Sequence, residues 1–254
     1  MKFLLQKNLL KINDFLNIKS ILDKYPTDYV DLIPFTNNIE VDPDTDYIPY
    51  GSTALTVIAK EQYNWSGLHF SYDTFNYEAA LQNRDDMLNN NVMRLDDAIN
   101  FFTKQDPNTL FFVRPSADLK QFSGDVFSAK ECHDWFKDMM ECTTSGSYKL
   151  DPDTKVVVSL PRKIYKEVRC FIVDGEVVSS SVYRENGVLI QKRCEDEGFQ
   201  KIADLWLPDD CCVMDLAYTS NGIKVIEFNC INSAGMYDCN KEKIFNSLWE
   251  YHIK

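Results

Sequence analysis

Short apolar runs alternate with helix-like patterns over the first hundred or so residues of the chain. Runs of four to six apolar residues are typical of strands, and apolar positions repeating every 3.6 residues are typical of helices. The predicted strands are Phe3–Leu5, Tyr29–Pro34, Tyr47–Tyr50 and Trp65–Phe70, and the predicted helices are Asp14–Tyr25, a stretch from Thr53 to about Tyr63, and Asn76–Asn83. This β-α-β-α succession predicts a small α/β domain with a parallel sheet.

Polar breaks at 89–91 and 104–108 precede a region richer in hairpins, and we place the domain boundary near residue 108. The strands predicted there are Leu110–Val113, Lys155–Leu160, Arg169–Val173, Glu176–Tyr183, Val213–Tyr218 and Ile223–Phe228. A type I′ turn is predicted at Asp174-Gly175. Three helices are expected, one capped by Ser128 and Glu131, one over Glu195–Leu205 and one over Asn240–His252.

One predicted hairpin places three oxygen-bearing side chains on the same face. If the reversal between Val213–Tyr218 and Ile223–Phe228 centres on Asn221, Asp215 lies opposite Glu227, and Asn229 shares that face. Two carboxylates and an amide oxygen suit Mg²⁺, which leaves coordination positions for phosphate oxygens. The alternative is a hairpin whose solvent-facing side happens to be acidic. A register shift of one residue would move Asp215 to the other face.

Although the chain as a whole is acidic, several basic residues would surround a polyphosphate if they were arranged around this hairpin. Arg162, Lys163, Lys166 and Arg169 lie within eight residues, Lys120 lies in a loop, and Arg114 and Arg184 end strands. Arginine forks bind phosphate oxygens in pairs and lysine supplies a point charge, so the set fits a polyphosphate carrying Mg²⁺. Each of these side chains taken singly is also typical of a solvated surface.

The chain carries 39 acidic and 27 basic residues, a formal net charge of −12 at pH 7. A surface that binds nucleic acid or anionic membranes is dominated by lysine and arginine, so we expect neither partner. No apolar run approaches a membrane span, and Met1–Asn8 interrupts its apolar stretch too early for a signal peptide. The eight cysteines are therefore expected to be reduced thiols in a cytoplasmic protein.

Two further patterns invite a ligand-binding interpretation. Cys132-His133 with Cys142 lacks the paired spacing of zinc sites, and Cys211-Cys212 sits at a predicted strand entry, so no zinc site is assigned. Gly51-Ser52 lies at a strand-to-helix junction, where backbone N–H groups of α/β sheets bind ligands. An ordinary turn with Ser52 as helix cap explains that dipeptide equally well.

The order of these features resembles the ATP-grasp fold. The resemblance covers about residues 110–240 and rests on a strand ending in Arg114 and a loop, then Glu167-x-Arg169 and its hairpin, Tyr183-Arg184, and Asp215 with Glu227-Phe-Asn229. It is nearest to the short clade related to the ribosomal-protein glutamate ligases, with members in bacteria and phages. The resemblance implies that the protein is located in the cytoplasm of a bacterium or of a phage-infected host.

The resemblance implies a mixed architecture, with a small α/β domain at 1–108 before an ATP-grasp domain at 109–254. Two α+β subdomains, roughly 109–158 and 159–254, would enclose ATP, with Mg²⁺ on Asp215, Glu227 and Asn229. Arg169 and Arg184 would hold the γ-phosphate and the oxyanion of the intermediate, and Arg114 stands where many members have lysine. The nucleotide-binding residues implied are Arg114, Lys120, Ser123, Gly124, Val158, Ser159, Leu160, Lys163 and Glu167. The implied substrate residues are Asn232, Gly235 and Ser52.

The activity implied is an ATP- and Mg²⁺-dependent carboxylate–amine ligase that forms an amide through an acyl phosphate. The carboxylate donor and the amine acceptor are not readable from the sequence, and the acceptor is open between a small molecule, a peptide and a protein. Two alternatives stay open. The chain could be an ATP-binding regulatory or host-interaction module without ligase activity, or an ATP-grasp kinase whose phosphorylated product forms no amide.

Overall fold

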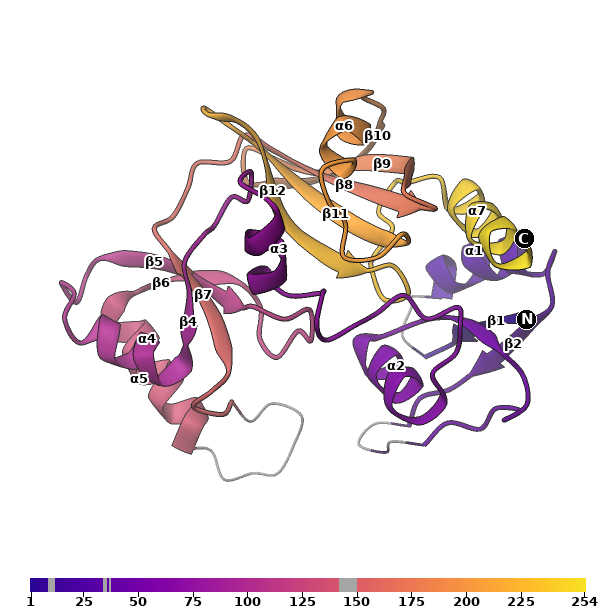
Figure 1. The fold of residues 1–254 in the computed structure, drawn as a ribbon, viewed down its shortest axis with the longest axis horizontal. Coiled ribbons are helices and arrows are strands. Elements are labelled where there is room, and N and C mark those ends of the chain that lie inside the picture. Colours follow the sequence, from indigo (N-terminus) through magenta and orange to yellow (C-terminus); the bar gives the residue numbers. More distant parts are fainter. Residues whose placement is uncertain (9–11, 34–35, 37, 142–149) are drawn as a thin grey trace.

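Three sheets organise the described part of the chain, which comprises residues 1–8, 12–33, 36, 38–141 and 150–254 of a computed structural model (Figure 1). The N-terminal sheet is parallel, in the order β2-β1-β3. Its strands are β1 (Lys2–Gln6), β2 (Thr27–Val30) and β3 (Tyr47–Tyr50). Helix α1 (Ile12–Leu22) connects the first two, and α2 (Thr53–Ile58) follows β3 and continues into the π-helix η1 (Ala59–Tyr63). The predicted small parallel α/β unit is confirmed.

The second sheet is antiparallel and has the order β4-β7-β5-β6. Its strands are β4 (Val92–Arg94), β5 (Leu110–Pro115), β6 (Asp125–Ser128) and β7 (Lys155–Ser159). Helices α4 (Leu95–Phe102) and α5 (Ala129–Glu141) cover one face, with Phe102, Phe111 and Phe136 in their shared core. The predicted capping box is present, since Ser128 N–H donates to Glu131 at 2.8 Å and Glu131 N–H donates back to Ser128 Oγ at 3.3 Å.

The third sheet is antiparallel and has the order β10-β9-β8-β11-β12. Its strands are β8 (Lys166–Val173), β9 (Glu176–Glu185), β10 (Val188–Cys194), β11 (Cys212–Thr219) and β12 (Gly222–Cys230). Asp174 and Gly175 have φ of +56° and +76°, which confirms the predicted type I′ turn. Helix α6 (Gly198–Ala203) is shorter than the predicted helix over Glu195–Leu205.

Both faces of the five-stranded sheet are covered, by different parts of the chain. Alternate residues such as Cys170 and Ile172 pack against α3 (Tyr77–Asn83) and α6. Their neighbours Phe171 and Val173 pack against the N-terminal strands and α7 (Lys241–Ile253). In Figure 1 the yellow α7 accordingly lies beside the indigo α1. None of the described helices is long and apolar enough to cross a membrane.

Two features bear on the predicted organisation. Strand β4 pairs with β7, and α4 packs against α5, so the four-stranded sheet begins before residue 108. We therefore propose a boundary just before β4. The strand predicted over Trp65–Phe70 is wrong, because the backbone there is bound by a side chain instead: Asn232 donates to Gly67 O at 3.0 Å and accepts from His69 N–H at 2.9 Å.

Candidate active site

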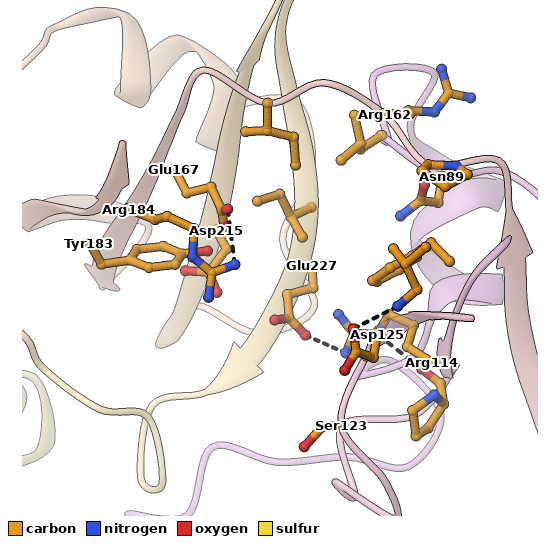
Figure 2. A pocket seen from close by; sticks show the side chains of 18 of the residues that line it. Asn89, Arg114, Ser123, Asp125, Arg162, Glu167, Tyr183, Arg184, Asp215 and Glu227 are labelled. Atoms are coloured by element: carbon orange, nitrogen blue, oxygen red, sulfur yellow. Dashed lines mark hydrogen bonds and ion pairs between the residues drawn. The ribbon is translucent and has the colours of Figure 1, made fainter. Parts of the chain in front are cut away.

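A cavity of about 590 Å³ lies between the four-stranded and five-stranded sheets. Figure 2 shows Glu167, Tyr183 and Arg184 on one side, and Asn89, Arg114 and Arg162 across from them. The lining includes five basic and five acidic side chains: Arg114, Lys120, Arg162, Arg169, Arg184, Asp118, Asp125, Glu167, Asp215 and Glu227. The charges of the described lining therefore balance. A charged ligand must therefore either bind together with its own counter-ion or replace an ion-pair partner of one of these side chains.

Strands β11 and β12 bring Asp215 and Glu227 directly opposite each other, as predicted. The turn alone does not produce this pairing, however. The pairs nearest the turn, from Thr219 with Gly222 to Leu216 with Val225, follow a register one residue off from that of Asp215 with Glu227. A bulge at Ile226 restores the register. The segment before β4 pairs with β12 there, because Leu88 N–H donates to Val225 O at 2.7 Å.

Each predicted metal-binding carboxylate is paired with an arginine whose side chain is at most 14% exposed. Arg169 Nε and Nη2 donate to the two carboxylate oxygens of Asp215 at 2.8 and 2.6 Å. Arg114 forms an ion pair with Glu227 and lies 5.2 Å from the ring centre of Tyr77. Burial alone would raise the pKa of Glu227, but the Arg114 guanidinium holds it below the ordinary value. Each carboxylate group of the hairpin is thus paired with one guanidinium group.

The loop after β5 reaches the same hairpin. Lys120 Nζ lies 3.4 Å from Asn229 Oδ1 and 3.8 Å from Asp118 Oδ1, and its φ of +50° places it in the left-handed region. Asn229 Nδ2 donates to Asp215 Oδ2 at 3.2 Å, which leaves its oxygen on the Lys120 side. The three predicted metal ligands and the loop lysine therefore form one contiguous polar cluster.

Asp118 is a buried carboxylate in this cluster that the sequence analysis missed. Its Oδ2 accepts the backbone N–H of Cys230 at 2.8 Å, but its Oδ1 is buried without a hydrogen-bond partner. Burial raises the pKa of Asp118 to about 6, against the opposing charge of Lys120. A buried oxygen lacking a hydrogen-bond donor is costly unless a cation or a bound ligand satisfies it.

Aromatic rings flank the arginines on the opposite wall. The rings of Tyr183 and Tyr237 stack with their centres 4.9 Å apart, and the Arg169 guanidinium lies 5.6 and 5.1 Å from those centres. Arg184, at the end of β9, donates to Glu167 across the strand pair at 3.3 Å. Its side chain is 44% exposed, whereas that of Arg169 is 9% exposed. Arg169 is fixed in place, and Arg184 retains freedom to reach a ligand.

Most of the predicted site residues lie together. The cavity is lined by Arg114, Lys120, Ser123, Gly124, Leu160, Glu167, Arg169, Arg184, Asp215 and Glu227. Asn229 lies directly behind, bonded to Asp215. Beyond these, Tyr183 and Tyr237 were not predicted as site residues, and their signal was weak because single tyrosines are common in strands and loops.

The connecting segment after β7 differs from the prediction. Val158 is buried in β7, and both its backbone N–H and C=O are hydrogen-bonded to Asn91, so its N–H is not free to donate to a nucleotide base. The Ser159 hydroxyl donates to Asn89 Oδ1 at 2.8 Å. Lys163 does not line the cavity; its ammonium lies 5.1 Å from the Tyr165 ring centre. The lining instead takes Leu160, Pro161, Arg162 and Ile164 from this segment.

The three predicted substrate residues do not line the cavity either. Asn232 is buried, and its amide donates to Pro49 O at 2.8 Å and to Gly67 O at 3.0 Å, so it fastens the N-terminal sheet to the hairpin. Gly235 O accepts from Arg169 Nη1 at 3.1 Å and so helps to position that arginine. Ser52 is the helix cap of α2, accepting from Leu55 N–H, as the ordinary-turn alternative has it.

The donor chemistry of this cavity fits a hard cation together with a polyphosphate. Carboxylate and amide oxygens are the protein ligands that Mg²⁺ takes, and the paired arginines match phosphate oxygens. Asp118 Oδ1 accepts no hydrogen bond and lies 3.8 Å from Lys120 Nζ, so it adds a further acceptor. In a complex, the carboxylates would turn from the arginines to the cation, and the arginines would turn to the phosphates.

Comparison with known proteins identifies the family and the fold. The model of the ATP-grasp domain, R2K clade family 2, matches residues 91–246. A search of curated protein sequences finds no match. Among solved structures, D-cycloserine synthetase DcsG has a TM-score of 0.67 at 12% identity, covering 99% of both chains. A RimK-domain ATP-grasp protein from Sphaerobacter thermophilus has a TM-score of 0.58 at 10% identity, covering 97% of this chain and 98% of that one.

A further structure, the ATP-grasp ligase PsnB complexed with a minimal precursor, has a TM-score of 0.56 at 12% identity, covering 98% of both chains. At these identities the likeness shows the fold, which extends over the N-terminal sheet as well as the region that the family model matches.

Proposed function

The chain belongs to the R2K clade of ATP-grasp domains, and from that premise we propose that it is an ATP- and Mg²⁺-dependent carboxylate–amine ligase. The solved structures of similar fold include enzymes described as a D-cycloserine synthetase and a D-alanine–D-alanine ligase, as well as the ligase PsnB. Proteins of one fold carry out different reactions, so the proposal rests on the site rather than on the fold.

The observation that carries the proposal is the arrangement of charges between the two sheets. Asp215 and Glu227 face each other across one hairpin, and each forms an ion pair with an arginine. An acidic hairpin on the surface would need no arginine partners, and a general anion site would not place two carboxylates at its centre. The two carboxylates and the two arginines together suit an anion that binds with a divalent cation.

Asp215, Glu227 and Asn229 would hold Mg²⁺, and Arg114 and Arg169 would hold the phosphates. When bound there, Mg²⁺ neutralises the charge that develops between the β- and γ-phosphates. The adenine would lie against the connecting segment, where Leu160 and Ile164 line the cavity in place of Val158. The loop of Ser123 and Gly124 would close over the phosphates; its Gly124 packs so close to Phe112 that an added Cβ would lie 3.0 Å from that ring.

In the first step, an oxygen of the donor carboxylate attacks the γ-phosphorus, the bond to the β-phosphate oxygen breaks, and ADP leaves. Little acid–base chemistry is needed, so positioning and charge stabilisation by Arg114 and Arg169 do most of the work. In the second step, an amine attacks the acyl carbon, phosphate leaves, and the amine loses a proton to give the amide. Arg184 is the exposed arginine of the site and would stabilise the oxyanion of that step.

We place the reaction in the cytoplasm, where ATP is available. The described cysteines are all free thiols, which agrees with a reducing compartment. The donor and acceptor are proposed by class alone: a carboxylate and an amine, the latter carried by a small molecule, a peptide or a protein.

The nucleotide site is tested first, by thermal unfolding with a non-hydrolysable ATP analogue, with and without Mg²⁺. A ligand at 100 times its Kd adds about 2.7 kcal/mol of stability, a shift that is easily measured. We expect a Mg²⁺-dependent shift in the wild type and in Glu176→Gln, a control on the exposed start of β9. Glu227→Gln should abolish it. Absence of the shift in the wild type would refute the proposal.

The ligase step is tested with donors carrying ¹⁸O in the carboxylate, screened against amino acids and short peptides as acceptors. Transfer through an acyl phosphate moves one ¹⁸O from the donor to the released phosphate, which mass spectrometry detects together with the amide. A phosphorylated product that persists with no amide would identify a kinase instead. A regulatory module would be favoured if ATP binds but no donor–acceptor pair is turned over, even with the host proteome supplied as the acceptor.

A further inference from the structure

A second group of titratable side chains lies away from the active site, where three distant segments meet. His69 follows η1, Asp209 precedes β11, and His252 lies in the last turn of α7. These residues line an open cavity of about 630 Å³ together with Asp210 and Tyr251. None of them lines the active-site cavity, and the ligase mechanism uses none of them.

The two imidazoles meet through the same ring atom. His69 Nε2 and His252 Nε2 are 2.9 Å apart, and the ring centres are 5.0 Å apart. On its other side, His69 Nδ1 lies 2.7 Å from Asp209 Oδ1. Because an ionised carboxylate can only accept, Nδ1 carries the hydrogen, and a neutral His69 presents the lone pair of Nε2 toward His252. This carboxylate–histidine arrangement is the one that orients metal-binding histidines.

The surroundings favour a cation on these lone pairs. Asp209 and Asp210 supply negative charge at the rim. The Cys211 thiol completes a group in which one atom each of His69, Asp209 and Cys211 lie within 4.8 Å of one another, a grouping found nowhere else among the described residues.

We propose that His69 and His252 bind a Zn²⁺ ion through their Nε2 atoms, with Asp209 fixing His69 from behind and water from the open cavity completing the coordination. Zinc–nitrogen bonds are about 2.0–2.1 Å long, so tetrahedral binding needs the two nitrogens about 3.4 Å apart. The rings must therefore separate by about half an ångström, which a side-chain rotation of His252 supplies. The ion would join the N-terminal region to the C-terminal helix and is independent of the ligase proposal.

The alternative is a hydrogen bond between the two rings with no metal, since 2.9 Å is also a normal N–H···N distance. Zn²⁺ binding decides between the two. The chain offers a matched control in its third histidine: His133 lies on α5, where its ring contacts Asp134. A Glu227→Gln background removes the carboxylate pair of the active site as a competing site for the ion.

The experiment is a calorimetric titration of EDTA-treated protein with Zn²⁺, followed by thermal unfolding at saturation. We expect one ion per chain in the Glu227→Gln background, and a Tm rise of roughly 5 °C. Adding His133→Ala should change neither. His252→Ala should abolish both, and Asp209→Asn should weaken binding by about 10–100-fold, as loss of such an outer partner does.

Co²⁺ substitution gives a second readout, because a bound Co²⁺ with nitrogen ligands absorbs visible light. Circular dichroism of His252→Ala without metal shows whether the variant is folded, so a lost signal cannot be confused with unfolding. No zinc uptake by the wild type, or equal uptake by folded His252→Ala, would overturn the site and leave a hydrogen-bonded pair only.

Discussion

The arginines of the active site differ in how firmly they are held, and we expect that difference to separate their roles. Arg169 makes two short bonds to Asp215, a third to Gly235 O, and lies beside two tyrosine rings. Among the described residues, Arg184 donates one hydrogen bond, to Glu167. A group fixed in advance suits the phosphates, which must be positioned before reaction. A mobile group suits an oxyanion that forms later.

Arg184→Ala is therefore expected to lower the turnover rate by about 10²–10³ while leaving nucleotide affinity within a few-fold of the wild type. Loss of one donor to a developing oxyanion has that magnitude. Steady-state ADP release and isothermal titration with the nucleotide measure the two quantities separately. Arg193→Ala on the neighbouring strand β10, where the side chain is bonded to Asp238 outside the cavity, is the matched control and should retain full turnover. Equal losses in the two variants would refute the role of Arg184.

Asp118 leads to a prediction about stability and pH. The pKa is about 6 in the folded protein against an ordinary value of 3.8. The folded state therefore keeps the proton to higher pH than the unfolded chain. The stabilising contribution of the proton is complete below about pH 3.8 and is lost as the pH rises through about 6.

Asp118→Asn removes this titration and keeps an oxygen to accept from Cys230 N–H. We expect its unfolding free energy, relative to the wild type, to rise by about 2–3 kcal/mol between pH 4 and pH 7.5. Urea unfolding at a series of pH values, without Mg²⁺ and nucleotide, measures the difference. A difference that stays constant over this range would show that Asp118 does not carry the shift.

At the level of elements, the sequence was most informative where local chemistry decides the geometry. The helix capped by Ser128 and Glu131 and the turn at Asp174-Gly175 were found because side-chain capping and positive φ leave clear signals. Strand β10 was missed although Asn186-Gly187, with φ of +47° and +81°, is a strong hairpin signal. The strand lies at the sheet edge and is mostly exposed, so its sequence VLIQKRC lacks the alternation of apolar and polar residues that marks a half-buried strand.

Other elements could not have been read from local signals. Helix α4 begins after Arg94 without any side-chain cap, and β4 has three residues, so both depend on pairing with β7 far along the chain. The register of Asp215 and Glu227 was predicted from the turn, but it results from the turn and the Ile226 bulge together. The pairing of each carboxylate with an arginine is likewise a property of the assembled sheets.

The turn and the bulge can be separated by mutation. Gly222 has φ of +93°, and a Cβ added there would meet no atom within 4 Å, so Gly222→Ala changes only the backbone energy. We expect a loss of roughly 1–2 kcal/mol of unfolding free energy. Ser220→Ala in the same turn, where φ is not positive, should stay within about 0.5 kcal/mol. Both follow from urea unfolding curves.

Because the bulge resets the register downstream, Gly222→Ala should still show the Mg²⁺-dependent nucleotide shift of the wild type. A variant that loses this shift while remaining folded would mean that the turn alone sets the carboxylate pair.

At the scale of the whole molecule, the family region and the N-terminal sheet share one core. Phe3 and Leu5 of β1 and Tyr50 of β3 pack in the same cluster as Phe171 of β8 and Phe245 of α7. Asn232, two residues after the end of β12, donates hydrogen bonds to Pro49 O and Gly67 O. The region matched by the family model, 91–246, therefore lacks part of the surface that covers its own five-stranded sheet.

A fragment of residues 91–254 is thus expected not to fold cooperatively by itself. It loses six buried apolar side chains of the shared core: Phe3, Leu5, Ile18, Leu22, Ile48 and Tyr50. Each buried side chain contributes about 1.5–3 kcal/mol, so the loss is roughly 10 kcal/mol or more. That is comparable with the entire stability of a typical domain. Near-ultraviolet circular dichroism during heating should show no sharp transition, and a dye that binds apolar surface should fluoresce.

Supplying residues 1–90 as a separate chain is the matched control for this fragment. If the shared core is what the fragment lacks, mixing the two chains should restore a cooperative transition and the Mg²⁺-dependent nucleotide shift together, because β1 and β3 cover the sheet whose other residues form the active site. A fragment that melts sharply and binds nucleotide without residues 1–90 would show instead that the ATP-grasp region is a self-sufficient domain. The N-terminal sheet would then contribute to substrate binding and would not be needed for the ATP-grasp region to fold.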